Sequence, residues 1–183
     1  MKRVELAHIL RAASRITSTT DILVVGSQSI LGSFDEDDLP DEAVGSIEAD
    51  VAFVGEDAAE KALAVDGAIG EESGFHQMNG YYGQGVEVDG LIVLPAGWQE
   101  RLVRWSSLSS EPGRALCLEP HDLAISKLAA FREKDQEFVY ALIEAGLLDA
   151  AVLLARLALT DVPPPHARRI ESWVQAIAAR FAE

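Results

Sequence analysis

The sequence of 183 residues is poor in the features that mark secreted, thiolate-metal and membrane proteins. Its one cysteine, Cys117, excludes an intrachain disulfide and a zinc site built from several thiolates. No stretch approaches the roughly 20 consecutive apolar residues of a membrane-spanning helix. The first 20 residues carry five charged side chains and lack the apolar core of a signal peptide. These absences predict a cytoplasmic protein that does not associate with a membrane.

Basic residues are almost missing from the middle of the chain. Residues 16–100 contain 18 acidic side chains and one basic side chain, Lys61, whereas the rest contains 12 acidic and 14 basic side chains. The formal charge of the whole chain is −15. This balance excludes a protein that coats duplex nucleic acid along a broad basic face. The acidic middle is a solvated surface, a partner-binding face or a cation site, and residues 35–42 are its densest part.

Hydrophobic patterning divides the chain into a part with strands and a part with helices alone. Helical spacing predicts helices, and β-branched or alternating runs predict strands. Before residue 119, the predicted elements are a helix over 3–17, a strand over 21–25, a strand over 46–54, a helix over 56–70, turns over 71–85, a hairpin over 85–94 and a strand over 115–118.

Four helices are predicted after residue 119, over 121–134, 135–147, 149–158 and 164–182. The expected class is therefore α/β, of the α+β kind. Residues 1–118 form a core with a sheet, and residues 119–183 form a helical part that packs on the same core.

A glycine and a serine follow the first predicted strand. The run Val24-Val25-Gly26-Ser27 passes from a buried strand into a short helix at Gln28. Backbone N–H groups at such a helix start, together with the serine hydroxyl, suit a phosphate group. Taken alone, a Gly-Ser pair at this place is more often an ordinary turn.

Two carboxylates two residues apart follow on the second predicted strand. Glu48 and Asp50 project from the same face of a strand, while Ile47, Ala49 and Val51 face the core. Two like charges this close raise each other's pKa unless a cation offsets them, and Mg²⁺ prefers carboxylate and phosphate oxygens. The alternative for this pair is an exposed strand face in an acidic protein.

In combination, the two features resemble the nucleotidyltransferase superfamily. The pattern stands here as VVGSQSILGS followed by SIEADVAF. The resemblance implies a mixed sheet flanked by helices, with a C-terminal helical bundle. It also implies a nucleoside triphosphate substrate, phosphate binding at Gly26 and Ser27, and Mg²⁺ or Mn²⁺ held by Glu48 and Asp50.

A second motif lies in the helical part. The run HDLAISKLAAFREKD, residues 121–135, resembles the lysine motif of the AbiEii and MenT toxin nucleotidyltransferases. By this resemblance Lys127 and Arg132 bind the triphosphate, the acceptor is the 3′ end of a transfer RNA or another RNA, and an antitoxin protein restrains the enzyme. Asp135 is either a catalytic base or the N-cap of the next helix.

Over residues 5–147 the chain also resembles domain of unknown function 6036, a nucleotidyltransferase-like group. The segments GYYGQGV and LPAGWQERL carry this resemblance together with the motifs above. Two features depart from the superfamily pattern. The spacer between Ser27 and Glu48 is long, at 20 residues, and the first acid is Glu where Asp is commoner. A third metal-binding acid would be Asp89 or Glu87, and Asp89-Gly90 fits a turn equally well.

These observations lead to two function hypotheses. The first is an Mg²⁺-dependent enzyme that moves a nucleotidyl group from a nucleoside triphosphate to a hydroxyl acceptor. The second is a nucleotide-binding or regulatory module of the same fold without turnover. Among other polar residues, Asp122 is expected to cap a helix after Pro120. Arg101 and Arg104 are expected either to contact substrate or to lie on a solvated helix face.

Overall fold

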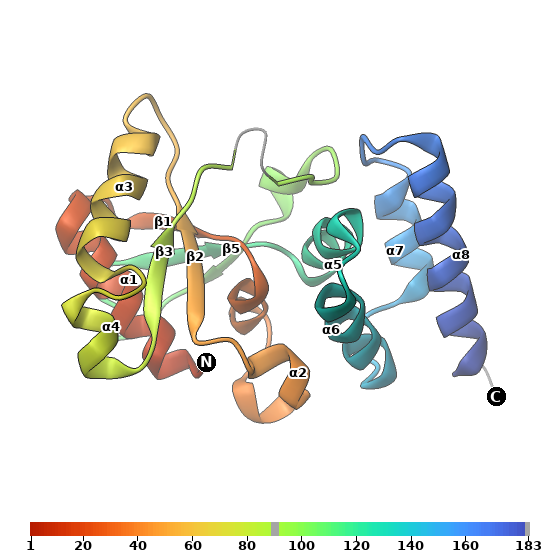
Figure 1. Cartoon of the computed structure of the whole chain (residues 1–183), viewed down its shortest axis with the longest axis horizontal. Helices are drawn as coiled ribbons and strands as arrows, with labels where there is room; N and C mark the ends of the chain where they lie inside the picture. Colours follow the sequence, from red (N-terminus) through yellow and green to blue (C-terminus); the bar gives the residue numbers. More distant parts are fainter. Residues whose placement is uncertain (89–91, 182–183) are drawn as a thin grey trace.

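The computed structural model describes residues 1–88 and 92–181, and its centre is one mixed β-sheet (Figure 1). The strand order is β3-β2-β1-β5-β4. The pairs β2/β3 and β1/β5 are parallel, whereas β1/β2 and β4/β5 are antiparallel. The strands are β1 (Asp21–Val24), β2 (Glu48–Ala52), β3 (Tyr82–Gly85), β4 (Val103–Trp105) and β5 (Arg114–Cys117). The expected fold class, a mixed sheet with flanking helices and a helical C-terminal region, is confirmed.

Helices α1 (Arg3–Thr17) and α3 (Ala58–Ile69) cover one face of the sheet. A Cβ atom on Gly83 of β3 would lie 2.8 Å from Ile9 of α1 and 3.1 Å from Ile69 of α3. Ala49 of β2 pairs with Gly83 and is fully buried on the same face. Because strand residues alternate between faces, Glu48 and Asp50 project from the opposite face.

The helical part contains α5 (Pro120–Ala130), α6 (Glu133–Glu144), α7 (Ala150–Leu157) and α8 (Pro164–Arg180). In Figure 1, α5 and α6 lie next to the sheet, and α7 and α8 lie on their outer side. A 3₁₀ helix, η1 (Ser27–Gly32), leads from β1 toward α5 and β5 and contacts both. One cluster of buried apolar side chains extends from α1 to α8.

Several predicted boundaries are wrong. Strand β3 and helix α4 (Gly74–Asn79) lie within the segment predicted to form turns. The hairpin predicted over 85–94 is not formed by the described residues 86–88 and 92–94, which lie outside any strand, and residues 89–91 lie outside the described part. Strand β4 was not predicted.

The boundary between the first two C-terminal helices also differs from the prediction. Helix α5 ends at Ala130, four residues before the predicted end of this helix at 134, and α6 begins at Glu133. The cause is Phe131, which takes a left-handed backbone conformation with φ of 52°. Such a residue ends a helix, and for a bulky side chain it is uncommon.

Within residues 1–88 and 92–181, every helix is too short or too polar to pass through a lipid bilayer.

Candidate active site

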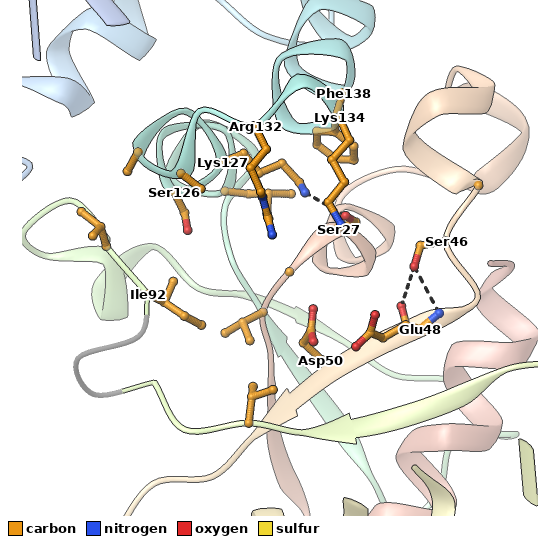
Figure 2. A pocket seen from close by; sticks show the side chains of 18 of the residues that line it. Ser27, Ser46, Glu48, Asp50, Ile92, Ser126, Lys127, Arg132, Lys134 and Phe138 are labelled. Carbon is orange, nitrogen blue, oxygen red and sulfur yellow. Dashed lines mark hydrogen bonds between the residues drawn. The ribbon is translucent and has the colours of Figure 1, made fainter. Parts of the chain in front are cut away.

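A cavity of about 610 Å³ lies between the sheet and helices α5 and α6 (Figure 2). This volume is in the range of small-molecule binding sites. Its acidic lining residues are Glu42, Glu48, Asp50 and Glu87, and its basic lining residues are Lys127, Arg132 and Lys134. In Figure 2, the basic side chains reach down from the helices toward the carboxylates of β2. The cavity therefore has walls of opposite charge.

The acidic wall is built on β2. Ala49 and Val51 are fully buried on the core face, so the predicted alternation is confirmed for them, whereas Ile47 is 50% exposed and does not face the core. Ser46 fixes the start of the strand, because its Oγ accepts a hydrogen bond from the Glu48 N–H at 3.1 Å. Both Glu48 and Asp50 line the cavity, as expected.

The environment of these two carboxylates disfavours their charged forms. Burial raises the pKa of Asp50, and the positive charge of Lys127 opposes this rise. Burial also raises the pKa of Glu48, and the neighbouring Asp50 adds to the effect. In the described part of the chain, neither carboxylate has a cationic side chain within 4.0 Å. Two half-buried carboxylates side by side without a close counterion suit a bound cation.

The turn after β1 is pressed against Asp50. Gly26 has φ of 57° and ψ of −169°, a conformation that an L side chain rarely adopts. A Cβ atom added there would lie 1.9 Å from Asp50 Oδ2. The Val25 N–H donates to the Asp50 carbonyl at 3.0 Å, so this approach is fixed by backbone pairing. Gly26 is thus required both by its backbone conformation and by the carboxylate beside it.

Lys127 of α5 connects the helical part to this turn. Its Nζ donates to Ser27 Oγ at 2.8 Å and lies 3.5 Å from Asp135 Oδ1. The ammonium group also lies 4.5 Å from the centroid of the Phe138 ring, a cation–π distance. Burial lowers the pKa of Lys127, and the charge of Asp135 opposes this change. The predicted partners Ser27 and Lys127, 100 residues apart in sequence, are therefore in direct contact.

Asp135 organises the basic wall. Its fully buried carboxylate accepts hydrogen bonds from Arg132 Nε at 2.6 Å and Arg132 Nη2 at 3.2 Å. Burial alone would raise the pKa of Asp135, but the Arg132 hydrogen bonds and the Lys127 charge outweigh it, and the pKa is lowered. The expectation that Asp135 is the N-cap of the next helix is wrong, because Arg132 occupies that position. A buried, doubly paired carboxylate with a lowered pKa is suited to positioning cations rather than to accepting a proton.

The cavity is also lined by residues that the sequence did not assign to nucleotide or metal binding. Lys134 extends into the cavity in Figure 2, and its positive charge partly opposes the rise in the pKa of Glu48 and of Asp50 that burial causes. Ser126 and Phe138 also line the cavity. The sequence favours Lys134 only as one of several basic residues for RNA. Its seven-residue spacing from Lys127 does not place the two on one helix face, because α5 ends at Ala130 and α6 begins at Glu133. Nothing in the sequence distinguishes Ser126 from other helix serines.

The third acid remains a prediction. Glu87 lines the same cavity as Glu48 and Asp50, and Asp89 lies outside the described residues. Over the described residues, no three Asp, Glu, His or Cys side chains come together as a metal-ion cluster. A cation held by Glu48 and Asp50 would need further oxygen ligands from substrate or water.

Comparison with known proteins agrees with this geometry. Residues 4–162 match the model of a family described as nucleotidyltransferase of unknown function (DUF6036). The chain belongs to this family. The match includes both walls of the cavity, from Gly26 to Asp135. No curated protein and no solved structure gives a significant match to this member of the DUF6036 family.

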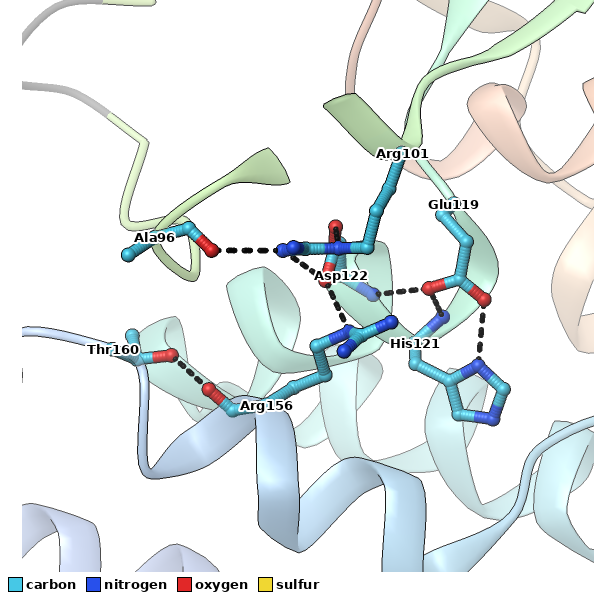
Figure 3. Close-up of polar contacts among 7 residues, drawn as sticks. All are labelled: Ala96, Arg101, Glu119, His121, Asp122, Arg156 and Thr160. Carbon is cyan, nitrogen blue, oxygen red and sulfur yellow. Dashed lines mark hydrogen bonds and ion pairs between the residues drawn. The ribbon is translucent and has the colours of Figure 1, made fainter. Parts of the chain in front are cut away.

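A second polar cluster of this DUF6036 protein has a different character (Figure 3). Asp122 does not cap α5, contrary to the prediction, because the N-cap is Glu119, whose side chain accepts from the N–H groups of His121 and Asp122. The fully buried Asp122 instead pairs with Arg101 Nε at 2.7 Å and Arg156 Nε at 3.0 Å. Arg101 does not lie on a solvated helix face, since its guanidinium pairs with the buried Asp122 and joins the η3 turn (Trp98–Arg101) to α5. Its expected contact with substrate stays a prediction.

Proposed function

We propose that this protein transfers a nucleotidyl group from a nucleoside triphosphate to a hydroxyl acceptor. The observation that carries the proposal is the facing pair of walls: Glu48 and Asp50 on β2 lie across the cavity from Lys127 and Arg132. A triphosphate with a bound divalent cation presents both signs of charge and is complementary to such a cavity. Membership in a nucleotidyltransferase family supports the same assignment.

Glu48 and Asp50 fit a divalent cation. They are carboxylates on one strand face, they lie on the cavity, and no close protein cation offsets them among the described residues. We propose that they hold Mg²⁺ or Mn²⁺. When bound, such an ion would supply positive charge that offsets the negative charge developing on the leaving pyrophosphate.

The basic wall and the Gly26 turn would bind the phosphates. Without a ligand, Lys127 donates a hydrogen bond to Ser27 and is paired with Asp135, so its ammonium group is held beside the turn after β1. Arg132 is held by two hydrogen bonds to Asp135, and its side chain is still 62% exposed. A guanidinium fixed on one side and open on the other can bind a phosphate oxygen. Asp135 would act through these two cations.

In the proposed reaction, the oxygen of the acceptor hydroxyl forms a bond to the α-phosphorus. The bond between the α-phosphorus and the oxygen that bridges it to the β-phosphorus breaks. Pyrophosphate leaves, and the proton of the hydroxyl is released to solvent. The resemblance to the AbiEii and MenT toxins suggests an RNA 3′ end as acceptor and an antitoxin protein as partner. Of the arginines proposed for RNA, Arg101 is held by the buried Asp122, whereas Arg114 is 56% exposed although it pairs with Asp21. Arg168 is exposed on α8, and the exposed Arg169 packs on the Phe131 ring.

Incubation with each labelled nucleoside triphosphate, total RNA and Mg²⁺ or Mn²⁺ tests the proposal. We expect label to be transferred by the wild-type protein and transfer to fall at least ~1,000-fold in Asp50→Ala, since a metal-binding carboxylate is lost. Asp37→Ala, an exposed aspartate outside the cavity, is the matched control and should retain full transfer. Circular dichroism and thermal unfolding check that both variants are folded.

The same samples test the alternative of a binding module without turnover. Calorimetric titration that detects tight, metal-independent nucleotide binding, with no labelled product from any triphosphate, would favour the module over the enzyme. Absence of both binding and transfer would contradict either function for this cavity.

A further inference from the structure

We infer that Phe131 is a positioning residue, through which helix α8 fixes Lys127 and Arg132 in the cavity. This inference rests on the proposed function, because it concerns the two cations assigned to the triphosphate. Phe131 itself does not line the cavity, and neither does any described residue of α8. If Phe131 or α8 affects ligand binding, the effect must therefore pass through residues 131–132, the turn between α5 and α6.

The backbone of Phe131 is in an unusual conformation at a sensitive place. It is one of three described residues other than glycine with positive φ, the others being Ser18 and Glu72, and the only aromatic one. Its N–H donates to the Lys127 carbonyl at 2.9 Å, and the next residue is Arg132. If Phe131 were right-handed, α5 would continue and Arg132 would take the next position of the same helix, about 100° around the axis from Phe131. The left-handed conformation therefore determines where Arg132 lies relative to Lys127.

Helix α8 holds the Phe131 ring on several sides. The Arg169 guanidinium lies 4.1 Å from the ring centroid, and the rings of His166 and Trp173 pack edge-on at 5.7 and 6.4 Å. His166 Nε2 also lies 2.9 Å from the Ala129 carbonyl at the end of α5. These contacts come from three successive turns of α8, and we refer to Arg169, His166 and Trp173 as the ring clamp. The ring clamp offsets the unfavourable backbone conformation of Phe131.

Substitutions at Phe131 separate positioning from simple packing. Alanine removes the ring and leaves the left-handed conformation unfavourable, whereas glycine removes the ring and adopts this conformation freely. If the ring serves to hold the turn, Phe131→Gly should bind ligand better than Phe131→Ala. If the ring serves only to fill space, glycine should be no better than alanine.

The measurement is calorimetric titration of the full chain with inorganic triphosphate, with thermal unfolding of each variant. We expect Phe131→Ala and Trp173→Ala each to weaken binding about 10-fold, and Phe131→Gly to stay within about 3-fold of wild type. In the Phe131→Gly background, Trp173→Ala should have less than about 2-fold further effect, because the turn no longer needs the clamp. Equal binding by Phe131→Gly and Phe131→Ala, or unchanged binding by Trp173→Ala, would overturn the inference.

Tyr140→Ala is the matched control. Tyr140 of α6 also packs against an aromatic ring and an arginine, Phe181 at 5.8 Å and Arg180 at 5.6 Å, but it lies away from the α5–α6 turn. Its loss should leave triphosphate affinity unchanged, and a 10-fold loss there would overturn the assignment to Phe131. Wild-type protein that binds neither inorganic triphosphate nor any nucleoside triphosphate would contradict the proposed function itself. Wild-type binding with the clamp variants unaffected would contradict the positioning role alone.

Discussion

Two buried aspartates occupy equivalent positions in successive helices but have different surroundings. Asp122 is the third residue of α5 and Asp135 is the third residue of α6, and both side chains are fully buried. Each pairs with two basic side chains. The partners of Asp122, Arg101 and Arg156, are 22% and 23% exposed, whereas Arg132 beside Asp135 is 62% exposed.

This difference separates a structural ion cluster from a candidate binding cluster. Around Asp122, both arginines come from other elements, η3 and α7, so the cluster joins parts of the chain. Around Asp135, the cations Lys127 and Arg132 line the cavity and have donors free to face a ligand. A buried aspartate by itself does not distinguish a structural cluster from a binding cluster. The location of its basic partners makes this distinction.

The largest expected effect is on stability, from loss of Asp122. Asp122→Ala leaves two partly buried guanidinium groups without their shared carboxylate, and we expect the free energy of unfolding to fall by about 3 kcal/mol. Urea denaturation measures this loss. Where the variant is folded, its affinity for inorganic triphosphate should equal that of wild type. A weaker affinity in the folded variant would contradict the separation of the two clusters.

Loss of Asp135 should have its main effect on binding. In Asp135→Asn the two cations are no longer held by a charged group, and we expect triphosphate affinity to fall about 30-fold, or roughly 2 kcal/mol. Isothermal titration calorimetry gives the dissociation constant. Asp122→Asn, studied at a temperature where it is folded, is the matched control. Equal losses of affinity in the two variants would mean that the comparison does not hold.

The pH dependence of stability should have opposite signs at the two walls of the cavity. The pKa of Asp50 is raised on folding, so the unfolded chain releases this proton first. Stability then falls as pH rises from about 3.9, the ordinary pKa of aspartate, through the raised pKa of the folded state. In buffer without divalent cations, Asp50→Asn should therefore be more stable than wild type at pH 7, by roughly 1 kcal/mol, with little difference at pH 3.

Asp135 provides the contrast in the same experiment. Its pKa is lowered on folding, so its contribution is present above the ordinary pKa and is lost as pH falls through the folded-state value. Asp135→Asn should be less stable than wild type at pH 7 and should approach it in acid. Urea denaturation across this pH range measures both variants. The same sign of pH dependence for both would contradict the assigned environments.

The smallest expected effect is that of salt. Raising NaCl from about 0.05 to 0.5 M shortens the electrostatic screening length from about 14 Å to about 4 Å. The stability difference between wild type and Asp135→Asn should shrink by about 0.5 kcal/mol, because Arg132 is exposed to solvent. The corresponding difference for Asp122→Asn should change less. A larger salt effect on the Asp122 variant would indicate that its cluster is the more open of the two.

The sequence was informative where local pattern and chemistry agree. The strand before Gly26, the same-face pair Glu48 and Asp50, and the helix that carries Lys127 all follow from short-range periodicity, and the structure brings them to one cavity. Helix α4 could also have been predicted, because Ser73 is a good N-cap and Gly80 ends the helix in a left-handed conformation. Both signals lie in residues 71–85, for which turns alone are predicted.

The missed features depend on contacts between distant residues. Arg101 and Arg156 meet Asp122 across 21 and 34 positions of sequence, and nothing local marks them as partners. Strand β4 has three residues and is defined by its pairing with β5. The break at Phe131 contradicts local propensity, because a phenylalanine seldom ends a helix in the left-handed conformation. Its cause is the ring clamp of α8, more than 30 residues later in the chain.

The contact between Gly26 and Asp50 limits how this site can change. No side chain fits at Gly26 without displacing the Asp50 carboxylate, so a substitution at Gly26 disturbs both the turn after β1 and the carboxylate beside it. Ser126 and Ile92, by contrast, line the cavity, and within the described part of the chain their side chains make no hydrogen bond to either charged wall. A selection for altered substrate preference should accumulate substitutions at these two positions while Gly26 stays unchanged. Gly26 and Asp50 would then be retained together, whereas Ser126 and Ile92 would vary.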